Sequence, residues 1–200
     1  MIQAHKQKLT FEEYLTYEDE TDNRYELIDG ELITLPPESE PNNAIVSYLF
    51  LVLVNTGIPW RCIKTHICEI QVPILREGDS ANRYPDLVIL RPEHILLTAS
   101  RLTITLDMPP PQLVVEVVSP GRVGRDRDYI SKRDQYAARN IPEYWIVDPQ
   151  EQMVAVLRLE SGEYVEVGMF QDQQSLVSPT FPQLRLTAGQ VLGGEFQPPI

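Results

Sequence analysis

Two acidic residues stand where an α/β protein normally buries apolar side chains. Glu116 lies inside the run 113–118, whose other members are leucine and valine. An unpaired carboxylate buried there would cost several kcal/mol, so a basic partner, a raised pKa, a metal ion or an exposed edge strand must compensate. Asp86 poses the same question at the start of the strand-like run 85–90, where an ordinary turn residue is the alternative. The pair marks the place where chemistry is expected.

Two carboxylates on core strands, followed by a helix that carries a lysine, are suited to one or two hard cations. Mg²⁺ takes oxygen ligands and keeps several waters, so two carboxylates and a backbone carbonyl suffice. Such an ion polarises a phosphoryl oxygen and acidifies a bound water, and a nearby ammonium stabilises the charge of the transition state. The pattern predicts metal-assisted phosphoester hydrolysis. Histidines and cysteines do not compete, because none of His5, His66 and His94 has zinc-ligand spacing to a cysteine.

Lys132 is the expected source of that ammonium. Asp128, Lys132 and Tyr136 recur at intervals of four residues in the predicted helix 126–139. This spacing places them on one helix face, where Asp128 can orient the lysine. The alternative is an ordinary exposed ion pair.

The elements that must position these residues follow from local patterns. Thr10 and Glu13 form a capping box that opens a helix ending near residue 19, and Asp29-Gly30 predicts a hairpin. A buried helix over 41–54, an extended segment over 62–74 and a terminal meander of two or three strands over 153–186 are also expected. Strands over 113–118 and 142–147 flank the helix 126–139, so they should run parallel. The prediction is one α/β domain over residues 1–200.

Composition narrows the function further. The chain has 200 residues, a net charge of −12 and 42% hydrophobic residues. This charge argues against binding nucleic acid by bulk electrostatics, although the segment 121–140 has six basic against three acidic residues. No apolar run reaches the length of about 20 residues that a membrane span needs. A cytoplasmic protein is expected, since the N-terminus lacks a signal-peptide pattern. Separately, Cys62 and Cys68 would be too far apart in extended chain to form a disulfide.

Five segments in order along the chain are typical of one known family. They are 25–32 (YELIDGEL), 84–89 (YPDLVI), 113–120 (LVVEVVSP), Asp128 with Lys132 and Tyr136, and 141–149 (IPEYWIVDP). Together they resemble the restriction-endonuclease-like proteins of the PD-(D/E)XK nuclease superfamily, specifically the Uma-type branch. The resemblance implies a restriction-endonuclease-like α/β core: a mixed central sheet flanked by helices, with an N-terminal hairpin and a C-terminal β meander.

The resemblance also implies roles for single residues. Asp86 and Glu116 would be metal ligands, with the backbone carbonyl of Val117 as the third, and the ion would be Mg²⁺ or Mn²⁺. The superfamily lysine normally stands two residues after the second acid, where this chain has Val118. Lys132 would replace it from the following helix, with Asp128 and Tyr136 as additional site residues.

Other parts of the site are expected on the same basis. Glu26 would be a further ligand or a water-orienting base, against the alternative of a solvated hairpin glutamate. Arg122, Arg125 and Arg127 would meet the phosphodiester backbone of nucleic acid. The leading hypothesis is thus an endonuclease acting on DNA, as a homodimer because duplex cleavage usually needs two sites. The alternatives are an inactive binding or assembly module of the same fold, favoured by the net charge and Val118, and a hydrolase of small phosphoesters.

Overall fold

The computed structural model of the chain describes residues 8–21, 23–121 and 125–193. Its centre is a six-stranded sheet in the order β11-β10-β9-β8-β6-β3. The strands are β3 (Ile63–Thr65), β6 (Leu87–Ile89), β8 (Leu113–Val117), β9 (Glu143–Asp148), β10 (Met153–Glu160) and β11 (Glu163–Gln171). β8 and β9 run parallel, whereas the other neighbours run antiparallel. The sheet is therefore mixed, and β8 lies inside it between β9 and β6.

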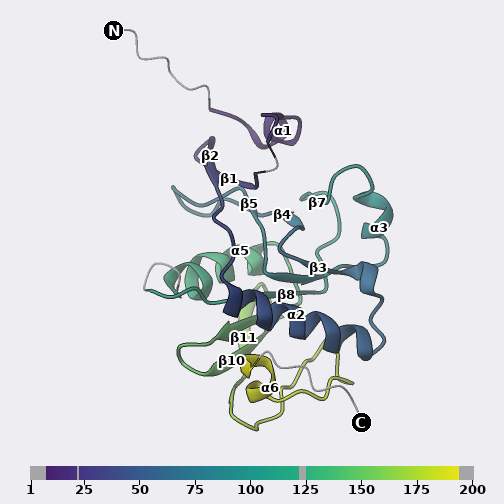
Figure 1. The fold of residues 1–200 in the computed structure, drawn as a ribbon. Helices are drawn as coiled ribbons and strands as arrows, with labels where there is room; N and C mark the ends of the chain where they lie inside the picture. The colour runs from purple at the N-terminus through teal and green to yellow at the C-terminus, as the bar shows by residue number, and fades with distance from the viewer. Residues whose placement is uncertain (1–7, 22, 122–124, 194–200) are drawn as a thin grey trace.

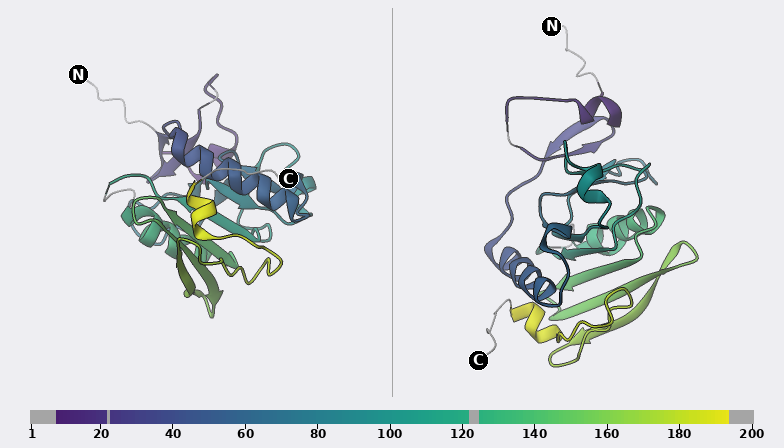
Figure 2. Two further views of the ribbon diagram at one scale, coloured as in Figure 1. Left: turned by 60° about the horizontal axis from the view of Figure 1, so that its bottom comes forward. Right: turned by 90° about the vertical axis from the view of Figure 1, so that its right-hand side faces the viewer.

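Helices cover the two faces of this sheet (Figure 1, Figure 2). On one face, α2 (Glu40–Asn55) and α6 (Ala188–Gly193) contribute to an apolar core with alternate residues of β8 and β9. On the other face lie a π-helical segment, η2 (Arg127–Lys132), and its continuation α5 (Arg133–Ala138). Successive strand residues point to opposite faces, so Leu113, Val115 and Val117 join the first core. Glu116 consequently points toward η2 and α5.

A smaller group of elements packs beside one end of the central sheet (Figure 1). It contains α1 (Phe11–Leu15), the hairpin β1 (Tyr25–Ile28) and β2 (Glu31–Thr34), and a three-stranded sheet of β4 (Glu69–Gln71), β5 (Asn82–Arg83) and β7 (Thr103–Ile104). Two short helices, η1 (Trp60–Cys62) and α3 (His94–Leu97), complete the described elements. Phe11, Tyr14, Leu27 and Ala81 form the small core of this group.

The predicted fold class, a restriction-endonuclease-like α/β core with a mixed sheet flanked by helices, is confirmed. The capping box at Thr10 and the hairpin at Asp29-Gly30 are both present, with φ of +50° and +82° at the two turn residues. The parallel pairing of β8 with β9 is also as expected. Cys62 and Cys68 are free and buried. Among the residues described, no helix is long and apolar enough to cross a bilayer.

Two predicted elements differ from the structure. The first helix ends at Leu15 rather than near residue 19. The segment 62–74 is not continuously extended, because His66 adopts φ +59° and turns the chain between β3 and β4. The C-terminal segment 153–186 provides two antiparallel strands within the described residues, in keeping with the predicted meander of two or three, and the chain then crosses the sheet face without regular structure to reach α6. Buried apolar side chains such as Leu176 and Phe181 hold that crossing in place without strand pairing.

Candidate active site

Glu116 is buried on β8 and is neutralised by a lysine. The glutamate is 1% exposed. Its Oε2 lies 2.7 Å from Nζ of Lys132, and its Oε1 accepts a 2.6 Å hydrogen bond from the hydroxyl of Tyr136. Both partners come from the helical segment that covers this face of the sheet. An ion pair and a neutral donor thus offset the cost of burying this carboxylate.

Asp128 holds the lysine from the same helical segment. Its Oδ1 lies 2.9 Å from Nζ of Lys132 and 3.3 Å from Nε of Arg127. The hydroxyl of Tyr144, on β9, donates to the backbone carbonyl of Asp128 at 2.9 Å. The segment is π-helical at this point, a geometry often found at functional sites. Asp128, Lys132 and Tyr136 therefore converge on Glu116, as their spacing predicts.

Asp86 approaches the same place from the residue before β6. Its Oδ2 accepts a 2.6 Å hydrogen bond from the backbone N–H of Val117, the residue after Glu116. Its Oδ1 lies 3.4 Å from Nδ1 of His66. The carboxylate of Glu116 belongs to β8 itself, and that of Asp86 is hydrogen-bonded to the next residue of the same strand. The two acids are therefore held close to the same part of β8.

A cavity of about 190 Å³ opens beside these groups. Its lining includes Asp86, Val117, Lys132, Glu26 and Arg127. Glu116 stands behind Lys132 rather than on the cavity wall. A small ligand in the cavity would therefore meet Asp86 and the lysine ammonium directly.

The charges of the site alter its protonation. Burial raises the pKa of Glu116; the ammonium of Lys132 at 2.7 Å opposes this shift, and the negative charges of Asp86 and Asp128 add to it. Burial alone would lower the pKa of Lys132, but the charges of Glu116 and Asp128 outweigh it and raise that pKa. Burial would raise the pKa of Asp86, but contact with His66, the charge of Lys132 and the Val117 N–H together lower it.

This electrostatic balance fits a divalent cation. Three carboxylates, those of Asp86, Glu116 and Asp128, surround the single buried ammonium of Lys132. In addition, Oδ2 of Asp128 is buried and has no hydrogen-bond partner among the described residues. Carboxylate and carbonyl oxygens are the ligands that Mg²⁺ prefers. The oxygen donors on the cavity wall, Asp86 and Val117, therefore suit such a cation. Both oxygens of Glu116 are already engaged, by Lys132 and by Tyr136, so its role as a ligand stays a prediction.

Glu26 lines the same cavity but is paired with an arginine. Its Oε2 lies 2.8 Å from NH1 of Arg83, and the carboxylate is mostly buried. The guanidinium of Arg83 is held in turn by Oε1 of Gln135 on α5, at 2.8 and 2.9 Å. Glu26 is thus a fixed wall residue, not a freely solvated hairpin side chain. Its predicted part as a ligand or base stays a prediction.

The three predicted phosphate-contacting arginines differ in position. Arg122 lies outside the described residues. Arg125 forms ion pairs with Asp148 at 2.9 Å and Glu151 at 3.0 Å, so its charge is already shared. Arg127 lines the cavity beside Asp128. Of the described arginines predicted for this role, Arg127 is the one on the cavity wall.

Glu38 and His66 also lie at the site, although neither is among the site residues that the sequence predicts. The side chains of Glu38 and His66, together with Asp86, each offer one ligand atom, and these atoms lie within 4.8 Å of one another. Glu38 precedes α2, whereas His66 occupies the turn between β3 and β4. A single histidine without ligand spacing and a glutamate in a Pro-rich segment give no sequence signal. Only the fold brings them together.

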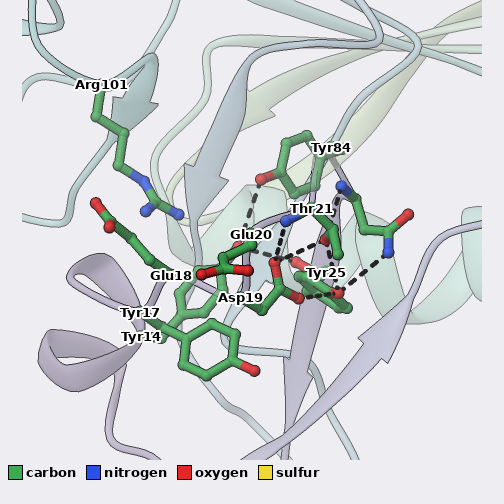
Figure 3. A pocket seen from close by; sticks show the side chains of 10 residues that line it. Tyr14, Tyr17, Glu18, Asp19, Glu20, Thr21, Tyr25, Tyr84 and Arg101 are labelled. Atoms are coloured by element: carbon green, nitrogen blue, oxygen red, sulfur yellow. Dashed lines mark hydrogen bonds between the residues drawn. The ribbon is translucent and has the colours of Figure 1, made fainter.

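A larger cavity adjoins this site on the side of the N-terminal elements (Figure 3). It measures about 440 Å³ and shares Tyr84 with the smaller one. Four tyrosines, an arginine and three acidic residues are among its lining: Tyr14, Tyr17, Tyr25, Tyr84, Arg101, Glu18, Asp19 and Glu20. The excess of carboxylates disfavours a phosphate there. The smaller cavity, with its lysine and paired acids, is therefore the candidate for phosphoester chemistry.

The fold and this cluster of acids around one lysine define a class, the restriction-endonuclease-like α/β proteins. Residues 11–189 of the sequence match the Uma2 family, described as putative restriction endonuclease. The chain belongs to that family. The family resemblance predicted from the five motif segments is thereby confirmed.

One solved structure gives an independent comparison. It is a putative nuclease belonging to DUF820 from Anabaena variabilis ATCC 29413. It superposes with a TM-score of 0.65 at 20% sequence identity, and the match covers 93% of this chain and 98% of the other. At that identity the likeness establishes the fold. No curated protein matches the sequence.

Proposed function

We propose that this protein is a divalent-metal-dependent endonuclease that hydrolyses phosphodiester bonds of DNA. The observation that carries the proposal is the approach of Lys132 Nζ to Glu116 Oε2 at 2.7 Å beside a cavity lined by Asp86. An acid just before one strand, an acid on the neighbouring strand and an ammonium from a helix are groups that suit metal-assisted phosphodiester hydrolysis. Membership of the Uma2 family supports the same reaction class.

Each side chain has a distinct task in this proposal. Lys132 presents a fixed positive charge at the cavity, where it stabilises the negative charge that develops on the phosphoryl oxygens. Asp128 holds the ammonium, and Tyr136 holds the carboxylate of Glu116. Asp86 and Glu116, with the carbonyl of Val117, would hold Mg²⁺ or Mn²⁺. A bound ion of this kind polarises the phosphoryl oxygen and lowers the pKa of a water.

The substrate is inferred from the surroundings of the cavity. Arg127 stands on its wall, and a phosphodiester backbone is the ligand that a guanidinium beside such a site suits. We further propose that two copies act together, since a duplex has two strands to cut. Two free, buried thiols suit a reducing compartment such as the cytoplasm.

The test is cleavage of supercoiled plasmid DNA with Mg²⁺ or Mn²⁺, compared with a chelator. The wild-type protein should nick and linearise the plasmid only when the metal is present. Asp86→Asn and Glu116→Gln should each remove the activity while the thermal unfolding transition remains cooperative. Glu31→Gln is a matched control, because that glutamate is exposed on the hairpin and lines no part of the smaller cavity.

Other outcomes would contradict the proposal in different ways. Cleavage unchanged in either site variant would remove Asp86 or Glu116 from the mechanism. Metal binding or DNA binding without cleavage would favour the inactive binding module. Hydrolysis of nucleotides or aryl phosphates without DNA cleavage would favour a hydrolase of small phosphoesters. Light scattering with and without a duplex oligonucleotide tests the dimer.

A further inference from the structure

His66 is held in an unusual backbone conformation beside the site. Its φ of +59° lies in the left-handed region, which is uncommon for residues other than glycine. Two hydrogen bonds fix the turn: the backbone N–H of His66 donates to the carbonyl of Asp86 at 3.0 Å, and Arg24 donates to the carbonyl of His66. Strained backbone of this kind persists where the surroundings impose it, often at ligand sites. The turn therefore gives the imidazole a fixed direction.

The imidazole itself lacks the partners that a buried ring normally has. Both ring nitrogens are buried, and neither makes a hydrogen bond within the described part of the chain. The nearest acidic atom, Oδ1 of Asp86, lies 3.4 Å from Nδ1 and outside good hydrogen-bond geometry. A buried polar group without a partner is unfavourable, so the ring is positioned for a ligand that the protein does not itself provide.

Glu38 faces the same point and is similarly unpaired. No ion pair or hydrogen bond of its side chain is present within the described residues, and it lines the smaller cavity beside Asp86. Desolvation and the negative charge of Asp86 raise the pKa of Glu38. A cation placed between the two carboxylates would relieve this repulsion. Arg24, Lys132 and His66 are the other charged or titratable groups whose charge reaches Glu38.

We propose that Glu38, His66 and Asp86 form a binding site for a divalent transition-metal ion, with His66 as the nitrogen ligand. The candidate ligand atoms lie within 4.8 Å of one another. Ligand distances of about 2.0–2.2 Å place donor atoms about 3–4 Å apart, so a small rotation of the exposed Glu38 side chain closes the set. The site shares Asp86 with the proposed nuclease site and rests on the proposed function for that ligand, but it adds Glu38 and His66 and uses neither Glu116 nor Lys132.

The ligand chemistry predicts which metals are preferred. An imidazole nitrogen binds zinc, iron, nickel and copper ions well, whereas Mg²⁺ selects oxygen ligands. Affinity for such a mixed site also rises along the series from Mn²⁺ to Co²⁺. We therefore expect Co²⁺ to bind this site more tightly than Mn²⁺, and Mg²⁺ to compete poorly for it.

The experiment titrates the full-length protein with Co²⁺ alone, followed by calorimetry and by visible absorption. Wild-type protein should bind Co²⁺ with absorption bands typical of a nitrogen ligand, and excess Mg²⁺ should not displace it. His66→Asn tolerates the left-handed backbone and should weaken Co²⁺ binding by at least about 10-fold, the usual loss when a metal site is altered. Glu38→Gln should weaken it, whereas Glu40→Gln, an exposed neighbour on α2, should leave it unchanged.

A second measurement keeps the proposal testable if a variant fails to fold. Spin-echo spectroscopy of Mn²⁺ bound to the Glu116→Gln protein, in which the ligand set proposed for the nuclease ion is incomplete, should reveal a directly coordinated imidazole nitrogen. Lack of that coupling, displacement of Co²⁺ by Mg²⁺, or full Co²⁺ affinity in a folded His66→Asn variant would each overturn the proposal. Glu116→Gln separates the two hypotheses, because it should stop DNA cleavage but retain the Co²⁺ bands.

Discussion

Two glutamates are buried on neighbouring strands of the central sheet, and their surroundings differ. Glu143, on β9, is 0% exposed and accepts hydrogen bonds from neutral groups: the indole N–H of Trp145 at 2.6 Å, the hydroxyl of Ser178 at 2.7 Å and the backbone N–H of Thr180 at 2.7 Å. Glu116, on β8, has a lysine and a tyrosine instead. Both carboxylates are satisfied, but only one is held by a charge that also faces a cavity.

The comparison separates a structural carboxylate from a candidate catalytic one. Glu143 fastens the C-terminal crossing segment to the sheet, because two of its donors lie in that segment. Glu116 belongs to a group in which three acids surround Lys132 beside open space. Burial of an acidic residue therefore does not by itself indicate a catalytic role. The countercharge and the access to a cavity are the informative features.

The largest expected difference comes from the same substitution at the two glutamates. Glu116→Gln should lower metal-dependent DNA cleavage by about 10³-fold, the scale seen when a key electrostatic group is removed, and should also lower stability, because its NH₂ group would face the ammonium of Lys132 or the hydroxyl of Tyr136. Glu143→Gln should retain the activity of the folded protein but cost about 1–3 kcal/mol, because its NH₂ group faces existing donors. Plasmid cleavage and urea unfolding measure the two effects. Equal loss of activity in both variants would remove the distinction.

Loss of the lysine should damage stability as well as activity. Lys132→Met leaves the carboxylates of Glu116 and Asp128 buried without their ammonium, at a cost of about 3–5 kcal/mol. Chemical unfolding at neutral pH measures this cost. Lys64→Met on β3 serves as the control, since that lysine forms no ion pair within the described residues. A Lys132→Met protein as stable as wild type would contradict the ion-pair account of this face.

Two tyrosines allow a similar comparison between a site residue and a structural residue, with smaller expected effects on stability and activity. Tyr136→Phe removes the hydroxyl that donates to Glu116 and should cost about 1–3 kcal/mol, the penalty for an unsatisfied buried acceptor, together with part of the cleavage activity. Tyr164→Phe removes a hydroxyl from the same aromatic group, but that hydroxyl donates to the backbone carbonyl of Ile141. Tyr164→Phe should therefore lower the stability of the protein without changing its cleavage activity. Cleavage rates of the two folded variants distinguish these roles.

The smallest effect concerns a buried histidine away from the site. Burial lowers the pKa of His94, whose Nδ1 accepts from the backbone N–H of Arg91 and whose ring faces the carbonyl of Pro109. The unfolded chain then binds more protons, so stability falls as the pH drops below about 6.5. The slope is at most about 1.4 kcal/mol per pH unit for one proton. Urea unfolding between pH 7.5 and 5 measures this decrease in stability. The decrease should be smaller in a His94→Gln variant than in the wild type, because that side chain does not titrate.

Much of the fold and half of the site follow from local sequence patterns. Glu116 stands out because valines flank it on both sides, whereas Glu143 begins its strand next to a proline and gives no such contrast. The position of Lys132 follows from helical spacing, which survives even though the first half of that helix is π-helical. Strong periodicity specifies these elements, and tertiary contacts only refine them.

The remaining features depend on contacts between distant segments. The strands β4, β5 and β7 have two or three residues each, too few for periodicity to identify them. His66 reaches Asp86 because a left-handed turn ends β3, and Glu38 reaches it because the chain enters α2 there. No local sequence pattern predicts that His66 or Glu38 belongs to a site. Sites assembled from turns therefore need the fold before they can be recognised.

The π-helical turn at Arg127–Lys132 has a consequence for chain length. A π turn holds one residue more than an α turn, so deleting Ser131 would let the segment relax into a regular α-helix. After the deletion Asp128 and the lysine would stand three residues apart in that α-helix, a spacing that still keeps two side chains on one face. The ion pair between Asp128 and Lys132 thus depends on their residue types more than on the exact length of this turn, and a protein shortened there by one residue should keep it.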